Sequence, residues 1–437
     1  MKKILMVAFH YPPVSGSSGV HRALSFSRYL PQYGWDPIVL TVTPNAHAAV
    51  ESGDSRIPPG VCVERALAFD SARALSIKGA YPRALALPDR WVSWLPGGVV
   101  KGLSLIRRHS PHLIWSTFPI ATAHLIGLWL HRMSGLPWVA DFRDPMTERD
   151  PLTGEEFPSD PTVRKVNGWI ERAAIRRCAR AVFTTAGTAE MYAQRFPEID
   201  SSRWAVIPNG YDEDSFRLAD TRVNQQRPGQ AGKIVLLHSG TLYSHARDPK
   251  TFFEALAALR GAGEIGPATL SVVLRGSGQE TLYQSYLKEL GLEDMVRLEG
   301  TVPYNEALAE MLSADGLLVF QASNCNWQIP AKIYEYLRAR RPILAFTDCN
   351  GDTAKLLRSE GIDTIVPIDS REDIARGLRT FLRSIRQGTA SQATQEGVER
   401  HSRRLRSREL ASLLDQVTGA GLERVRETGT AARSHGR

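Results

Sequence analysis

Residues 1–30 read MKKILMVAFHYPPVSGSSGVHRALSFSRYL and have the pattern of a strand, a loop and a helix. An apolar run, residues 4–9, leads into a segment rich in Pro, Ser and Gly, and residues 23–30 follow with a helical pattern. A strand that is apolar along its whole length has no solvent-facing side, and such strands are typical of parallel sheets with helices on both faces. The start of the chain therefore predicts an α/β fold and favours a buried first strand over a signal peptide.

The same alternation of apolar runs and helical patterns fills two parts of the chain. In the first part, the further runs expected to form strands are 37–42, 113–116, 138–141, 181–185 and 204–207. The rhythm restarts at Lys233, and the runs of the second part are 234–238, 270–275, 297–299, 316–320, 342–346 and 365–367. Two Rossmann-like, doubly wound domains are therefore expected, and a cleft at their junction is the expected ligand site.

The expected domain boundaries follow from where this rhythm stops. The N-terminal domain covers residues 1–213, and the C-terminal domain covers residues 233–385. Residues 214–232 are polar and end in a Gly- and Pro-containing stretch, which predicts a linker. Residues 386–417 are expected to form a C-terminal helical segment that packs back, and residues 418–437 a flexible tail.

Composition excludes several classes of protein. The 437 residues, 43% hydrophobic and 23% charged, are typical of a globular chain of two or three domains rather than of a fibre or a disordered protein. The four cysteines form neither a CxxC pair nor a cluster, so no zinc site or disulfide framework is expected, and reduced thiols suggest a cytoplasmic protein. No apolar run approaches the ~20 residues that a membrane-spanning helix needs. The net charge of +8 is compatible with nucleic acid, an anionic membrane or phosphorylated ligands.

Two groups of residues in the first part are candidates for binding. Gly16, Ser18 and Gly19 precede the first helix, and Arg22 lies one turn into it, an arrangement that can receive a phosphate, although a plain turn explains the glycines equally well. The motif WVADFRDP, residues 138–145, places polar residues directly after a buried strand.

In that motif, Asp141, Arg143 and Asp144 are expected at the carboxyl end of a parallel strand, where α/β enzymes keep polar groups. The alternative is an Asp–Arg pair that pins the loop. Further along, Asn209 begins an Asn-Gly turn, which either serves only the chain reversal or lies at the hinge of the expected cleft.

The second part carries a basic pair beside an expected helix start. Arg247 and Lys250 flank Pro249, and cations at the positive end of a helix are unfavourable unless an anion binds there. Arg247 and Lys250 are therefore the candidates for binding a diphosphate. Arg275 and Gly276 end a later strand. In the helix that follows Pro330, Lys332 and Glu335 lie on one face and are expected to border the cleft.

Aromatic and basic residues also gather in the first part. Residues 89–108, DRWVSWLPGGVVKGLSLIRR, are either a ledge for a membrane surface or lipid acceptor or part of the core. The Arg-rich segments 164–180 and 400–408 are either ordinary surface or a contact with an anionic membrane. The dispersed charge gives no basic patch with interleaved aromatics, so no nucleic-acid partner is expected.

Five motifs in order carry a family resemblance. They are PPVSGSSG (12–19), VADFRDP (139–145), IPNGYD (207–212), HSGTLY with RDPKTF (238–252) and IPAKIYEYLRARRPIL (329–344). Together they resemble the glycosyltransferases of the GT-B fold, in particular the family-four group of nucleotide-sugar-dependent, mostly retaining enzymes. The resemblance spans about residues 1–385.

The resemblance implies roles for the candidate residues. The nucleotide would bind the C-terminal domain, with Arg247 and Lys250 acting on the diphosphate in catalysis, Arg275 and Gly276 near the base or phosphate, and Glu335 on the ribose beside Lys332. From the N-terminal side, the donor would meet Gly16, Ser18, Gly19 and Arg22, with Asn209 at the junction. Arg143 would border the acceptor, and Asp141 and Asp144 would be the catalytic carboxylates.

The resemblance also implies a chemistry without metal and without a cofactor, because the nucleotide sugar is a substrate. The acceptor would be a glycan or a lipid-linked intermediate of a cell-surface polysaccharide, reached at the inner face of the membrane. In one respect the chain departs from the family, whose two glutamates are separated by seven residues, because Trp327 stands where the first is expected. Its role would pass to Asn324, Asn326, Gln328 or a backbone group.

That departure keeps two alternatives open. One is a nucleotide-sugar epimerase of similar fold. The other is a non-catalytic scaffold that binds a nucleotide or glycan.

Overall fold

The computed structural model describes residues 1–14, 18–47, 50, 56–74, 81, 86–150, 153–226, 232–243 and 246–434. The chain divides into two compact units, one of Met1–Pro208 with Arg403–Arg437 and the other of Asn209–Ser402. The C-terminal segment thus belongs to the first unit, and the boundary lies a few residues before the expected one.

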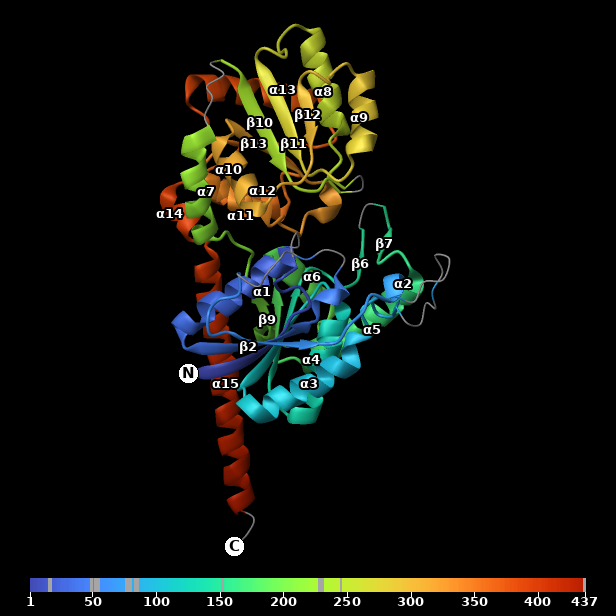
Figure 1. Ribbon diagram of the computed structural model, residues 1–437, viewed down its shortest axis with the longest axis vertical. Coiled ribbons are helices and arrows are strands. Elements are labelled where there is room, and N and C mark those ends of the chain that lie inside the picture. Colours follow the sequence, from blue (N-terminus) through green and yellow to red (C-terminus); the bar gives the residue numbers. More distant parts are fainter. Residues whose placement is uncertain are drawn as a thin grey trace. The chain divides into compact units, whose positions relative to one another are not determined.

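The first unit is built on a parallel sheet of seven strands in the order β3-β2-β1-β4-β5-β8-β9 (Figure 1). The strands are β1 (Lys2–Val7), β2 (Trp35–Val42), β3 (Cys62–Ala66), β4 (Leu113–Thr117), β5 (Trp138–Arg143), β8 (Arg180–Phe183) and β9 (Trp204–Val206). The six strands expected from the sequence are confirmed, and β3 was missed. A separate antiparallel pair consists of β6 (Glu148–Arg149) and β7 (Glu156–Phe157).

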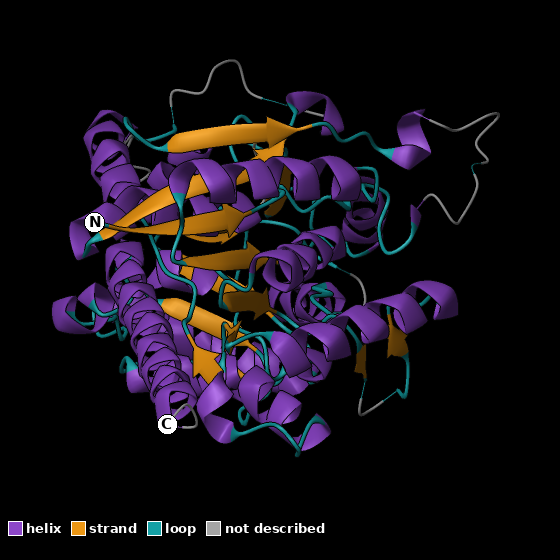
Figure 2. Ribbon diagram, turned by 90° about the horizontal axis from the view of Figure 1, so that it is seen from below, coloured by secondary structure: helices purple, strands orange, loops and turns teal. Residues whose placement is uncertain are grey.

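Helices cover both faces of this sheet, as in Figure 2. The α-helices are α1 (Ser18–Tyr29), α2 (Ser71–Ala74), α3 (Trp94–His109), α4 (Ala121–Ser134), α5 (Pro161–Arg177), α6 (Ala186–Arg195) and α15 (Arg403–Ser434). The 3₁₀ turns are η1 (Leu30–Tyr33), η2 (Pro44–Ala46) and η4 (Ser201–Arg203). One core cluster joins the sheet to α3, α4, α5 and α6, and a second joins its other face to α1 and α15.

The last helix, α15, packs back on the first unit as expected. Leu410 and Leu414 are fully buried beside Phe26 of α1, and Lys2 pairs with Asp415 at 2.8 Å. The helix continues to Ser434, which corrects the expected flexible tail from residue 418.

The second unit contains a parallel sheet of six strands in the order β12-β11-β10-β13-β14-β15. Its strands are β10 (Ile234–Ser239), β11 (Leu270–Arg275), β12 (Val296–Glu299), β13 (Gly316–Phe320), β14 (Ile343–Phe346) and β15 (Ile365–Val366). Its helices are α7 (Glu213–Gln226), α8 (Lys250–Gly261), α9 (Glu280–Glu289), α10 (Tyr304–Ser313), α11 (Lys332–Ala339), α12 (Asp352–Ser359), α13 (Arg371–Gln387) and α14 (Gln395–Glu399), with the turn η5 (Ser323–Cys325). All six expected strands are confirmed.

The expected linker is wrong for most of its length, because α7 occupies residues 213–226. Phe216 and Ala219 are fully buried, and Val223 packs against the same cluster, so the helix has an apolar stripe at helical spacing. Arg338 of α11 binds Glu213 through two bonds of 2.7 and 2.8 Å. The helix is therefore an integral part of the second unit.

The aromatic ledge expected at residues 89–108 is mostly core. Trp94 is fully buried, and Trp91 packs against the same cluster while its indole Nε1 donates to the carbonyl oxygen of Ala46 at 3.0 Å. Packing, rather than a lipid, explains these tryptophans.

Candidate functional site

Each sheet has one place where the strand order reverses direction. In the first unit it lies between β1 and β4, and in the second between β10 and β13. Loops that leave the carboxyl ends of two such strands diverge to opposite faces of the sheet and leave a crevice, which is where open α/β sheets bind ligands. The predicted site residues follow these strands or their neighbours, so they fall into one group in each unit. That the two groups share one cleft stays a prediction.

In the first unit, the predicted Arg22 and Asp141 form a buried ion pair. Asp141, at the end of β5, is completely buried, and its carboxylate accepts two bonds from the Arg22 guanidinium, at 2.8 and 2.9 Å. Thr117 of β4 donates a third bond to it at 2.9 Å, and Arg22 also donates to the carbonyl oxygen of Pro208 at 3.2 Å. The pair ties α1 to the ends of β4 and β5.

This geometry bears on the roles expected for the two residues, which stay predictions. The carboxylate of Asp141 is buried and accepts three hydrogen bonds, which favours a positioning role over the predicted catalytic one. Arg22 is bound to a protein carboxylate, which makes a contact with phosphate less favourable. The sequence alternative of an Asp–Arg pair is thus present, but the arginine is Arg22 instead of Arg143.

A strained turn follows directly. The register of β5 shifts between Asp141 and Arg143, and Arg143 has φ of 62°. The amide of Asp144 donates to the carbonyl oxygen of Phe142 at 2.7 Å, which closes a three-residue turn around Arg143. A left-handed conformation at a non-glycine residue costs roughly 1–2 kcal/mol, and such strain clusters at functional sites. The turn leaves Asp144 half-buried, whereas Asp141 and Arg143 are buried.

His10 and Arg143 enclose the start of α1. A Cβ atom at Gly19 would lie 3.1 Å from both His10 Nδ1 and Arg143 Nη1, so this position needs the small residue. Burial, with the positive charge of Arg143, lowers the pKa of His10 to about 4, and burial lowers that of the neighbouring His47 to about 4 as well. Both imidazoles are therefore neutral near pH 7. Of the other predicted loop residues, Ser18 opens α1, and Gly16 lies outside the described residues.

In the second unit, α11 presents Lys332 to the end of β10. Lys332 Nζ lies 3.0 Å from His238 Nε2, and His238 Nδ1 lies 2.9 Å from the carbonyl oxygen of Leu318. The bond to Leu318 requires a proton on Nδ1, which leaves Nε2 as the acceptor for the lysine. A Cβ atom at Gly240, whose φ is 118°, would lie 2.7 Å from Lys332 Nζ. His238 and Gly240 thus determine where the ammonium group of Lys332 lies.

Positive charge accumulates here. Burial and the nearby Arg247 lower the pKa of Lys332 well below its usual value, with Glu335 acting in the opposite direction. Burial and Lys332 in turn lower the pKa of His238. Two cations close together beside a neutral imidazole are costly in isolation and become favourable when an anion binds.

The basic pair at the start of α8 is partly committed to the protein. Lys250 Nζ lies 3.6 Å from Asp248 Oδ2 and 6.0 Å from the centre of the Tyr286 ring. The guanidinium of Arg247 stacks over Tyr243 at 5.4 Å. Both side chains are half-buried, so both can still reach a ligand at this end of β10.

Glu335 is buried and oriented by a tyrosine. Tyr304 Oη donates to Glu335 Oε1 at 2.7 Å. In the loop before α11, Trp327 is half-buried, and the Asn326 amide donates to Asp348 Oδ2 at 2.7 Å. That bond uses the amide nitrogen of Asn326 and leaves its Oδ1 without a partner among the described residues, so Asn324, Asn326 and Gln328 all stay candidates for the role of the missing glutamate.

The predicted donor contact of Arg275 is not favoured. Its guanidinium binds the carboxylate of Glu310 through bonds of 2.8 and 2.5 Å and donates to the carbonyl oxygen of Gly300 at 2.9 Å. Arg275 therefore ties β11 to α10, which is a structural role. Gly276 has φ of 62° and lies against Thr301, so its backbone conformation explains the glycine. Asn209, half-buried, is the first residue of the second unit.

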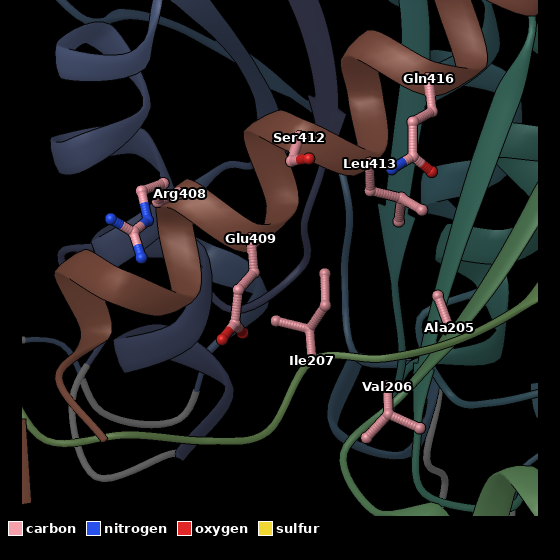
Figure 3. Close-up of a pocket in the computed structure, with 8 residues that line it drawn as sticks. All are labelled: Ala205, Val206, Ile207, Arg408, Glu409, Ser412, Leu413 and Gln416. Carbon is pink, nitrogen blue, oxygen red and sulfur yellow. The ribbon is translucent and has the colours of Figure 1, made fainter. Parts of the chain in front are cut away.

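One surface pocket lies away from all these residues. It has a volume of about 480 Å³ and lies between the edge strand β9 and α15 (Figure 3). Its lining is Ala205, Val206, Ile207, Arg408, Glu409, Ser412, Leu413 and Gln416. No predicted site residue contributes to it. Within the described part of the chain, no three His, Cys, Asp or Glu residues are grouped as metal ligands, and no helix is long and apolar enough to cross a membrane.

Comparison with known proteins shows what the chain resembles. Residues 19–215 match the family model described as Glycosyltransferase Family 4. The match covers less than half of the 437 residues and lies mostly in the first unit, which is therefore similar to family-4 glycosyltransferases. No curated protein matches it in sequence.

Solved structures of similar fold align with almost the whole chain. Sucrose-phosphate synthase from Thermosynechococcus elongatus aligns with a TM-score of 0.62 at 15% identity, covering 99% of this chain and 100% of that one. Anabaena HepE in complex with UDP and glucose gives 0.64 at 15% identity, covering 95% and 100%. WaaG, a glycosyltransferase involved in lipopolysaccharide biosynthesis, gives 0.57 at 13% identity, covering 94% and 95%. These likenesses confirm the predicted GT-B fold.

Three residues beside the candidate site were missed from the sequence. His10 and His238 were not among the predicted site residues, although each lies at the carboxyl end of the first strand of its unit. The sequence did offer a signal for both histidines, because each stands at the end of the strand next to which the strand order reverses. Tyr304, which orients Glu335, follows β12 and carried no signal in the sequence.

Proposed function

We propose that the enzyme transfers a sugar from a nucleotide-diphosphate sugar to a glycan or a lipid-linked acceptor, with retention of configuration and without a metal ion. The observation that carries the donor assignment is the place of Lys332 at the carboxyl end of β10, where its Nζ contacts the neutral His238 and the nearby Arg247 lowers its pKa, so that a bound anion would be favourable there. The likeness to HepE, whose structure contains UDP and glucose, supports the same class of donor.

These cations supply the electrostatics of the reaction. Negative charge develops on the phosphate oxygens of the leaving nucleoside diphosphate as the glycosidic bond breaks, and fixed positive groups stabilise it more than they stabilise the bound donor. Arg247, Lys250 and Lys332 can fill the role that a metal ion has in other transferases. Glu335, held by Tyr304, would accept hydrogen bonds from the ribose hydroxyls.

The first unit would position the acceptor. Among its predicted carboxylates, Asp144 is the better candidate to receive the proton of the attacking hydroxyl, because it is half-buried whereas Asp141 is completely buried. Attack on the face that the leaving group vacates retains the configuration of the sugar. Arg143, buried beside Gly19, would border this acceptor side.

The test is a panel of nucleotide sugars incubated with the purified protein and a membrane extract, with the products identified by mass spectrometry. Lys250→Ala and Glu335→Gln should lower turnover of the accepted donor, whereas Lys288→Ala, an exposed lysine on α9, should not. Absence of binding and turnover across the panel would overturn the proposal. So would equal activity of Lys250→Ala and wild type.

One observation favours a second candidate. Trp327 occupies the place of a glutamate that the family resemblance leads one to expect, so the chain could bind the nucleotide sugar as a scaffold without transfer. Calorimetric binding without product, for every acceptor offered, would identify that function. Release of nucleotide with an epimerised sugar, in the absence of an acceptor, would instead identify an epimerase.

A further inference from the structure

Three neighbouring helices cover one face of the sheet in the first unit. α3, α4 and α5 all pack on the same core cluster, with α4 in contact with both others, and they are adjacent in Figure 1. Each helix leads into a strand of a parallel sheet, so the three run in the same direction. Their outer sides therefore form one continuous surface, which we call the α3–α5 face.

The α3–α5 face exposes large apolar side chains. Trp129 and Met133, one turn apart on α4, are 44% and 57% exposed, and Trp169 in the middle of α5 is 53% exposed. Val100 of α3 is 71% exposed. Single exposed apolar residues are ordinary, but two tryptophans, a methionine and a valine on adjacent helices form a group that needs an explanation.

The charged residues of these three helices are almost all positive. The helices contain nine lysines and arginines, three in α3, one in α4 and five in α5, and a single acidic residue, Glu171. Glu171 is completely buried and is held by Arg195 and Thr147, so the helices themselves expose no carboxylate.

Acidic residues from other elements neutralise only part of this charge. Glu64 pairs with Lys101 and Arg108, at 3.2 and 3.4 Å. Glu156 pairs with Arg164 at 2.6 Å, and Glu198 pairs with Arg176 at 3.4 Å. On α5, the exposed residues Lys165, Trp169, Arg172 and Arg176 follow one another at helical spacing, so cations flank the tryptophan on both sides along one line.

We infer that the α3–α5 face docks this protein on a membrane surface of anionic lipids. Tryptophan places its ring at the level of lipid headgroups, and exposed arginines and lysines are attracted to acidic headgroups within a Debye length of the surface. A nucleic acid would need the cations but would leave the methionine and valine in water. The combination of aromatic, apolar and cationic side chains on helices that expose no acid of their own fits a lipid surface.

This surface differs from the one expected from the sequence. Of residues 89–108, the tryptophans are in or against the core, and Val100, Arg107 and Arg108 are the exposed apolar and basic side chains that contribute to the face. The main contribution comes from α4 and α5. The inference concerns the first unit alone and is independent of the donor, so it can fail or hold whatever the sugar is.

The experiment is cosedimentation of the full chain with vesicles. Vesicles of phosphatidylcholine with phosphatidylglycerol should bind the protein in a salt-dependent manner, and vesicles of phosphatidylcholine alone should bind it far less. The double variant Arg172→Glu, Arg176→Glu should weaken binding to the anionic vesicles at least about tenfold, because each basic residue near the surface contributes on the order of a fivefold factor.

Matched controls separate this face from net charge. The variant Arg383→Glu, Arg386→Glu makes the same charge change on α13 of the other unit, where both arginines are exposed, and should bind vesicles like the wild type. Brominated lipids should quench tryptophan fluorescence, and this quenching should fall in the variant Trp129→Phe, Trp169→Phe. All these positions are on the surface, so circular dichroism and the unfolding temperature should stay unchanged.

Several results would overturn the inference. Failure of the protein to bind anionic vesicles, or equal binding to both vesicle types, would contradict it. So would a control variant, Arg383→Glu, Arg386→Glu, that loses as much vesicle binding as the α5 variant, or a tryptophan variant whose fluorescence is quenched as strongly as that of the wild type. Loss of sugar transfer with vesicle binding intact would count against the proposed reaction and not against this surface.

Discussion

Replacing Asp141 by asparagine separates a positioning role from a catalytic one. In the folded protein the Asp141 carboxylate accepts two bonds from Arg22 and one from Thr117, and neither member of the ion pair is more than 7% exposed. Asparagine preserves the shape but removes the charge. The guanidinium of Arg22 then stays buried opposite a neutral amide.

The expected cost follows from this burial. Removing one partner of a buried ion pair costs about 3–5 kcal/mol, because the other charge stays desolvated and uncompensated. For a unit of this size, each kcal/mol lowers the unfolding temperature by roughly 2–4 °C, so Asp141→Asn should lower it by roughly 6–20 °C. The half-buried Asp144, whose charge lies near Arg143, is the comparison, and Asp144→Asn should cost less than Asp141→Asn because its carboxylate is only partly desolvated.

The assay combines urea unfolding with single-turnover kinetics. The double variant Arg22→Met, Asp141→Leu should regain most of the lost stability, since an apolar pair of similar volume is often neutral in place of a buried ion pair. Asp144→Asn should keep more of the stability and lower the rate at least about a hundredfold if Asp144 takes the acceptor proton.

Two outcomes would refute this reasoning. One is a stability loss below about 1 kcal/mol for Asp141→Asn, which would mean that the pair is not the constraint the geometry indicates. The other is a normal rate for Asp144→Asn together with a lost rate in a fully folded Asp141→Asn variant, which would make Asp141 the catalytic carboxylate.

Three further expectations concern other contacts. Burial lowers the pKa of His124 to about 4, so the unfolded chain binds more protons below pH ~6.5, and His124 alone should lower the free energy of unfolding by about 1.4 kcal/mol between pH 7.5 and 5.5. Urea titration should find the loss smaller by that amount in His124→Phe but not absent, because His10, His47 and His238 contribute in both proteins. Gly240→Ala should weaken nucleoside diphosphate binding at least about tenfold by calorimetry, because its Cβ would displace Lys332 Nζ, whereas Gly263→Ala, with φ of 72° and open space, should not. Arg275→Met should lower stability by about 1–3 kcal/mol with an unchanged KM for the donor, and a raised KM with normal stability would restore the predicted donor contact.

The sequence predicted most of the sheets because their strands are apolar on both faces. All twelve expected strands are present, within a few residues. β3, Cys62–Ala66, was missed because Glu64 and Arg65 interrupt its apolar run, as an edge strand of a sheet permits. α7 was missed because the polar composition of its residues outweighed the apolar stripe that Phe216 and Ala219 form.

The candidate site shows a different limit of the sequence. Its residues were found because charges that directly follow buried strands must meet at one edge of a parallel sheet, a rule that depends only on local order. Which charges pair depends on contacts across more than a hundred residues, as between Arg22 and Asp141, and no local pattern encodes that choice. Arg275 and Lys332 illustrate this limit, because their partners in the folded chain differ.

Both are cations near the carboxyl end of a strand, and from the sequence each is an equally good phosphate ligand. The structure gives Arg275 a carboxylate and a carbonyl, which satisfy it. It gives Lys332 a neutral histidine and the nearby Arg247, whose effect on the pKa of the lysine exceeds that of Glu335. A binding site is therefore recognised less by the presence of charge than by charge that the protein compensates only in part, and that property belongs to the folded chain alone.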